Sequence, residues 1–171
     1  MTGSVSGRAW VFGDDIDTDL LAPGLYMKGG LETLAAHCLE AVRPDFAGQV
    51  ATGDVVVAGR NFGIGSSREQ AAQALKHLGC GAVLARSFGG IFYRNALNCG
   101  LYCLTLPGDA TIFDGDRVTV DPVSGTIRDD TSARTWTTDP LPDHLVAMVE
   151  AGGLVPHLKR KLAVKAESAS E

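Results

Sequence analysis

Short apolar runs alternate with amphipathic segments through the middle of the chain. Val55–Ala58, Ala82–Ala85 and Leu101–Leu106 are apolar runs of strand length. Such runs predict strands buried on both faces, as in parallel sheets. Between them, Ser67–Leu78 and Phe88–Asn98 have helical periodicity, and each reaches a glycine within two residues of its end. The pattern therefore predicts two strand–helix–strand units and a parallel α/β core.

The pattern of the segment before this core predicts one strand and one helix, joined by a long turn. Arg8–Phe12 predicts a first strand, and Gly13–Met27, rich in carboxylates and punctuated by glycine and proline, predicts a long turn. Apolar residues then recur at helical spacing over Leu31–Val42, and Pro44 closes that element.

The segment after the core changes to short β-type runs and then to helix. Leu141–Val164 predicts helix, interrupted at Gly152–Gly153 and at Pro156, and the polar tail Lys165–Glu171 predicts disorder. The runs that predict antiparallel strands are Asp116–Asp121, Thr126–Asp129 and Thr135–Thr137. The whole is an α/β chain with an antiparallel addition and a C-terminal helical segment.

Composition narrows the class of protein. The 171 residues suit one domain, 1–171, and 45% of them are hydrophobic, as in ordinary globular proteins. Fifteen Lys and Arg against twenty Asp and Glu give a net charge of −5, which argues against nucleic acid or an anionic membrane as partner. Because no apolar run approaches the roughly 20 residues of a membrane span, we expect a cytoplasmic protein.

The four cysteines do not have the spacing of a metal site. No two of them form a CxxC pair. Cys99 and Cys103 are four apart, but a turn-forming Gly100 separates them and no suitable histidine lies nearby. Free cysteine packs as a small hydrophobic residue, so we expect buried thiols and no metal bound by this chain. The four are Cys38, Cys80, Cys99 and Cys103.

The segment Gly59–Gln70, GRNFGIGSSREQ, connects a predicted strand to a predicted helix. We call residues 59–68 the glycine loop. Ser66 and Ser67 each precede a Glu or Gln by three residues, which is the spacing of a capping box. Arg68 adds a guanidinium that can bind a carboxylate through two parallel hydrogen bonds. Helix-terminal N–H groups, two hydroxyls and this cation together predict an anion site.

The residue pattern alone leaves other interpretations of the glycine loop open. A plain strand-to-helix turn with good caps would explain the glycines and Ser67 without any ligand. A Walker phosphate loop needs a lysine that is absent, and a dinucleotide turn needs a glycine where Arg68 stands.

A second polar motif is Gly13–Asp19, GDDIDTD, which we call the acidic turn. Its four carboxylates suggest a metal at first, but the glycine and glutamate of an EF-hand do not fall in place. A solvated turn is the alternative interpretation.

Three motifs together resemble the small subunit of the 3-isopropylmalate dehydratase (isopropylmalate isomerase) family, which is similar to the swivelling C-terminal domain of aconitase. They are GDDIDTDLLAP from Gly13, GDVVVAGRNFGIGSSREQ from Gly53 and SFGGIFYRNALNCG from Ser87. The resemblance covers about residues 8–162. It implies a swivelling β/β/α domain with a parallel α/β core, short antiparallel strands and a C-terminal helical segment.

The resemblance also implies an activity shared between two chains. In the family, a separate large subunit carries a [4Fe–4S] cluster, and this chain itself would bind none. The two form a heterodimer or heterotetramer that dehydrates and rehydrates a 2-hydroxy-polycarboxylate, interconverting 3- and 2-isopropylmalate in leucine biosynthesis. By position, Ser66 matches the catalytic base. Ser67 and Arg68 match residues that hold a substrate carboxylate, and Thr18 and Asp19 match the turn that lines the same site.

Substrate identity stays open. The resemblance implies that the loop around Lys28 decides which substrate a family member accepts. There a cation suits a homoaconitate-, citrate- or other tricarboxylate-type substrate, although a solvated lysine is the alternative. Methylmalate is a further candidate, as is a catalytically silent, anion-binding regulatory module. Family members often carry Cys where Ile64 stands and His where Gln70 stands, which suggests a paralogous branch.

Overall fold

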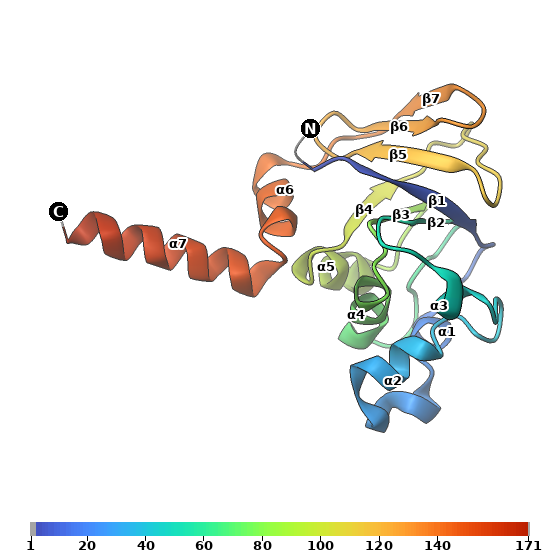
Figure 1. Cartoon of the computed structure of the whole chain (residues 1–171), viewed down its shortest axis with the longest axis horizontal. Helices are drawn as coiled ribbons and strands as arrows, with labels where there is room; N and C mark the ends of the chain where they lie inside the picture. Colours follow the sequence, from blue (N-terminus) through green and yellow to red (C-terminus); the bar gives the residue numbers. More distant parts are fainter. Residues whose placement is uncertain (1–2, 171) are drawn as a thin grey trace.

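Seven strands form one mixed sheet in the computed structural model, which describes residues 3–170 (Figure 1). The strand order across the sheet is β4-β3-β2-β1-β5-β6-β7. The strands are β1 (Val5–Val11), β2 (Val55–Ala58), β3 (Ala82–Ala85), β4 (Tyr102–Thr105), β5 (Arg117–Asp121), β6 (Thr126–Asp129) and β7 (Arg134–Thr137).

The parallel half of the sheet confirms the predicted α/β core. β1, β2, β3 and β4 pair in parallel, with Trp10 opposite Val56, and Val56 opposite Val83. Every residue of β2 and β3 is buried, which explains why their sequences are continuous apolar runs rather than alternating ones. The antiparallel half confirms the other predicted strands, because β5 pairs with β1 and is followed by β6 and β7.

Two hydrophobic clusters lie on opposite faces of the sheet. One contains Trp10 and Phe62 together with Leu75 of α4, and the other contains Val55, Ile127 and Val146 of α6. The helices are α1 (Thr18–Leu21), η1 (a 3₁₀ helix, Gly24–Gly29), α2 (Gly30–Ala36), α3 (Phe46–Gln49), α4 (Glu69–His77), α5 (Gly90–Asn98), α6 (Asp143–Glu150) and α7 (Leu154–Ala169).

The region between β1 and β2 differs from its prediction. The expected turn Gly13–Met27 contains α1 and η1, because the Asp17 carboxylate caps α1 by accepting from the Leu20 N–H at 2.9 Å. The expected helix Leu31–Val42 ends at Ala36. Leu39 has a left-handed backbone with φ of 61°, which a regular helix cannot contain.

The C-terminal region also departs from its prediction. The chain breaks between α6 and α7 at the glycine pair, as predicted, but Pro156 lies inside the first turn of α7. A proline is tolerated there because first-turn N–H groups have no partner within the helix. Helix continues to Ala169, through most of the tail expected to be disordered, because Ala, Lys and Glu favour helix. Within residues 3–170, no helix is long and apolar enough to cross a bilayer.

Candidate functional site

The glycine loop is held against the acidic turn by main-chain hydrogen bonds. The Gly63 N–H donates to the Ile16 carbonyl at 2.7 Å, and the Thr18 N–H donates to the Ile64 carbonyl at 2.9 Å. Because each segment donates to the other, the two loops form one unit at the ends of β1 and β2.

Each of the four carboxylates in the acidic turn has an internal partner. Asp14 accepts from the Arg60 N–H at 2.7 Å, and Asp15 accepts from the Asn61 side-chain amide at 2.9 Å. Asp17 caps α1, and Asp19 pairs with Arg68. Within residues 3–170, no three His, Cys, Asp or Glu side chains are grouped so that they could hold a metal ion. The acidic turn therefore fixes the glycine loop, which neither the metal interpretation nor the solvated-turn interpretation anticipated.

Two glycines let the loop approach its neighbours closely. Gly63 has φ of 80°, and a Cβ there would lie 2.2 Å from Cγ of Phe92. Gly65 has φ of 108°, and a Cβ there would lie 3.0 Å from Oγ1 of Thr18. No other residue type combines this backbone with this clearance. The glycines thus set the position of the residue that follows them, Ser66.

Ser66 and Ser67 do not cap the helix that follows them, so the capping-box prediction is wrong. α4 begins at Glu69 with Arg68 as its N-cap residue and no side-chain cap. The Arg68 N–H instead donates to the Ser66 carbonyl at 2.8 Å, which turns the chain before the helix starts. Both serines are exposed. Their hydroxyls are consequently available to a ligand at the positive end of α4.

Arg68 is anchored beside the two serines. Its Nη1 pairs with the Asp19 carboxylate and donates to the Ala22 carbonyl at 3.1 Å. Within residues 3–170, Nη1 makes the hydrogen bonds of this guanidinium, and Nη2 and Nε donate to no protein group. A Cβ on Gly24 would lie 3.9 Å from Nη2, so the start of η1 borders the guanidinium. The structure therefore places Asp19 against Arg68, next to Ser66 and Ser67.

Thr18 and Lys28 lie differently from the other predicted site residues. Thr18 is only 2% exposed and packs beneath Gly65, so it supports the loop from behind rather than lining an open surface. Lys28 is exposed at the far end of η1. It is four residues from Gly24, or about 8 Å along a 3₁₀ helix, a distance that a lysine side chain can largely cover.

Sequence reasoning assigned no role to Asn61 and Ser87, which lock the glycine loop to the segment before α5. The Asn61 N–H donates to Ser87 Oγ at 2.8 Å, and the Phe62 N–H donates to the Ser87 carbonyl at 3.0 Å. Asn61 has φ of 60°, a conformation that asparagine tolerates better than most residues. The asparagine before Gly63 was the sequence feature that could have predicted this left-handed turn.

Three of the four cysteines, Cys38, Cys80 and Cys103, are buried, and Cys99 is partly exposed. Burial raises the pKa of the Cys80 thiol to about 12, and burial also raises the pKa of Cys38 and Cys103 well above the usual thiol value. These three thiols therefore stay protonated at neutral pH and pack as apolar core groups.

Comparisons with known proteins agree with this arrangement. A family model described as the aconitase C-terminal domain matches residues 43–109. The methanogen homoaconitase small subunit of Methanothermobacter thermautotrophicus is 50% identical, over 92% of each chain. The 3-isopropylmalate dehydratase small subunit 1 of Methanopyrus kandleri is 47% identical, over 94% of this chain and 96% of that one. A crystal structure of 3-isopropylmalate dehydratase from Methanocaldococcus jannaschii matches with a TM-score of 0.89 and 41% identity, covering 96% of this chain and 99% of that one.

The mixed sheet and the glycine loop thus lie in a chain of the aconitase C-terminal domain class, whose family model spans β2 to β4. Within that class, the chain belongs to the family of 3-isopropylmalate dehydratase small subunits, which are parts of hydro-lyases. This confirms the family and fold predicted from the three motifs. Because the relatives are named small subunits, they imply a large-subunit partner.

Proposed function

We propose that this chain supplies the catalytic base of a two-subunit hydro-lyase that interconverts 3- and 2-isopropylmalate through dehydration and rehydration. The observation that carries the proposal is an exposed Ser66, released from helix capping, next to an anchored Arg68. A silent anion-binding module would need Arg68 but would have no use for a second hydroxyl held in front of it.

Ser66 takes the proton from the carbon atom next to the substrate carboxylate. A hydroxyl with the acidity of water, pKa about 15.7, costs about 12 kcal/mol to ionise at neutral pH. The N-terminus of α4 offsets at most about 2 kcal/mol of this cost. The remainder requires a dry site in which fixed N–H groups and Arg68 stabilise charge as it develops. Because Ser66 is exposed in this chain, a partner has to cover it.

The neighbouring residues position the substrate. Ser67 donates to a substrate carboxylate, and Arg68 binds it through the guanidinium nitrogens that Asp19 does not occupy. Thr18, although predicted to touch substrate, acts here by supporting Gly65 from below.

The iron–sulfur cluster belongs to the large subunit, where an open iron would polarise the leaving hydroxyl and stabilise a carboxylate. The donor set of this chain fits that assignment, because within residues 3–170 no three His, Cys, Asp or Glu side chains are grouped so that they could hold a metal. Four cysteines without a disulfide suit a reducing compartment, which we take to be the cytoplasm.

The decisive experiment compares the chain alone with the chain plus the large subunit of the same organism. We expect turnover of 3-isopropylmalate only in the mixture, measured by the ultraviolet absorbance of the dehydrated intermediate. Turnover by the chain alone would contradict the need for a covering partner. A mixture that forms a complex but is inactive on every 2-hydroxy-polycarboxylate offered would contradict the proposed reaction.

A tricarboxylate substrate of the homoaconitate type is the second candidate, favoured by the exposed Lys28 and by the homoaconitase relative. If Lys28 binds a distal carboxylate, Lys28→Val should lower kcat/KM for homoaconitate by about 10- to 100-fold, the range for a hydrogen bond to a charged group. Turnover of 3-isopropylmalate should change little. Lys28→Arg keeps the cation and should retain most activity on homoaconitate. Equal effects of Lys28→Val on both substrates would show that Lys28 does not select between them.

A further inference from the structure

Helix α7 extends away from the rest of the protein (Figure 1). It packs against α6 and α5, and none of its described residues is buried. By contrast, the preceding helix α6 buries Val146, Met148 and Val149. A helix of 16 residues without a buried side chain has no stabilising face within its own chain.

The apolar residues of α7 nevertheless lie mainly on one face. Leu154, Leu158 and Leu162 follow at intervals of four, and Val155 precedes Leu158 by three. Residues spaced this way line one side of a helix. Their exposed fractions are 37% for Leu154, 60% for Val155, 47% for Leu158 and 66% for Leu162. We call these four residues the α7 stripe.

Lysines border the α7 stripe on both sides. At 100° per residue, Lys161 falls just outside Leu154 on one side and Lys159 just outside Val155 on the other, whereas Lys165 lies in line with the stripe, beyond Leu162. All three lysines are exposed. Within residues 3–170, no carboxylate lies within 4 Å of their ammonium groups. An apolar strip with a cation on each side and one at its far end complements an apolar groove with acidic rims.

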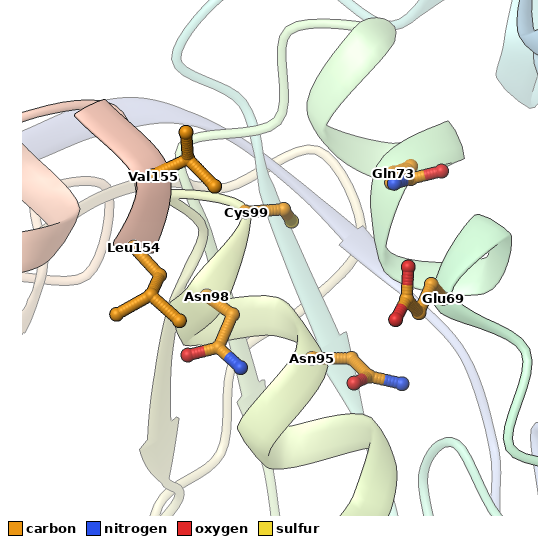
Figure 2. A pocket seen from close by; sticks show the side chains of 7 residues that line it. All are labelled: Glu69, Gln73, Asn95, Asn98, Cys99, Leu154 and Val155. Atoms are coloured by element: carbon orange, nitrogen blue, oxygen red, sulfur yellow. The ribbon is translucent and has the colours of Figure 1, made fainter. Parts of the chain in front are cut away.

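The base of the α7 stripe opens into a pocket beside the candidate site. The pocket has a volume of about 300 Å³. Figure 2 shows Leu154 and Val155 at its α7 end and Glu69, the first residue of α4, on the opposite side. Glu69 directly follows Arg68. The pocket therefore lies between the first turn of α4, which directly follows the glycine loop, and the base of the α7 stripe. Asn95 and Asn98 of α5 line it between these two ends.

We propose that the α7 stripe and this pocket form a docking surface for the large subunit, which presents an apolar groove edged by carboxylates. The inference rests on the proposed function, because the partner that covers Ser66 lies next to the pocket. A second copy of this chain would bring two lysine-bordered stripes together, which like-charge repulsion disfavours. A membrane is disfavoured because the stripe lacks aromatic anchors and the chain carries a net charge of −5.

The test measures affinity for the purified large subunit by titration calorimetry, and kcat of the complex at saturating small subunit. Leu162→Gln should weaken binding at least tenfold, whereas kcat at saturation should stay unchanged because α7 does not touch the reacting atoms. The matched control is Val164→Gln, which changes a side chain that is 65% exposed on the opposite face. Lys161→Glu should also weaken binding and should reduce its salt dependence, whereas Arg160→Glu, on the opposite face, should not.

The outcomes separate this inference from the proposed function. Equal affinities for Leu162→Gln and Val164→Gln, with an active complex, would overturn the docking surface and leave the function intact. Failure of the unmodified chain to bind the large subunit would overturn the function itself. Two further measurements look for another partner: sedimentation for self-association, and binding to phosphatidylglycerol vesicles. If Leu162→Gln abolishes either of these without changing affinity for the large subunit, α7 binds another partner and the inference is overturned.

Discussion

Replacing Ser66 by alanine should lower kcat of the assembled enzyme by about 10² to 10⁴, the usual contribution of a positioned general base. The substitution removes one exposed hydroxyl and leaves the main chain of the glycine loop unchanged. Folding and assembly should therefore stay as they were, because the fixed positions of Gly63 and Gly65 do not depend on the Ser66 side chain. Initial rates with the large subunit, together with thermal melting of the variant, measure both effects.

Two comparisons make the Ser66 result specific. Ser67→Ala should raise KM more than it lowers kcat, because Ser67 is proposed to hold the carboxylate rather than to move the proton. Ser124→Ala, which changes an exposed serine in the turn between β5 and β6, should leave both constants unchanged. A kcat for Ser66→Ala close to that of the unmodified enzyme would remove Ser66 as the base.

The sequence predicts the sheet well because burial on both faces leaves a direct imprint on composition. Val55–Ala58 and Ala82–Ala85 are apolar throughout, and the structure has β2 and β3 with those bounds. The turn before α2 is less predictable. α1 is only four residues long, and its formation depends on Asp17 and on hydrogen bonds to the glycine loop some 45 residues further along the chain.

In the candidate site, too, some features follow from the local sequence and others from contacts between residues far apart in the chain. Ser66, Ser67 and Arg68 are recognisable as a motif, but their hydrogen bonds are not. The capping-box prediction is wrong because the Arg68 N–H donates to the Ser66 carbonyl and the chain turns before α4 begins at Glu69. The side chain of Arg68 pairs with Asp19, which is 49 positions away in sequence. The motif is therefore local, whereas the path of the chain through it is set together with a distant segment, and the two serines are exposed.

Gly63→Ala should destabilise the chain more than any change to the catalytic side chains. The new Cβ would lie 2.2 Å from Cγ of Phe92, and the residue would have to keep φ of 80°. A left-handed backbone costs a non-glycine residue about 1–2 kcal/mol, and overpacking a core adds about 1–3 kcal/mol. The sum is about 2–5 kcal/mol of unfolding free energy, which corresponds to a fall in Tm of roughly 5–15 °C for a domain of this size.

The matched control for that strain is Gly90→Ala at the first residue of α5, where no atom lies within 4 Å of the added Cβ. Its Tm should be unchanged or slightly higher, since alanine favours helix over glycine. A second variant separates the two causes, because Gly63→Ala combined with Phe92→Ala removes the clash but retains the strained φ. If the steric argument holds, the cost of Gly63→Ala should be smaller in the Phe92→Ala background than in the unmodified chain. Equal Tm values for Gly63→Ala and Gly90→Ala would mean that the glycine loop can move away from α5, and a loop free to move could not hold Ser66 in position for proton transfer.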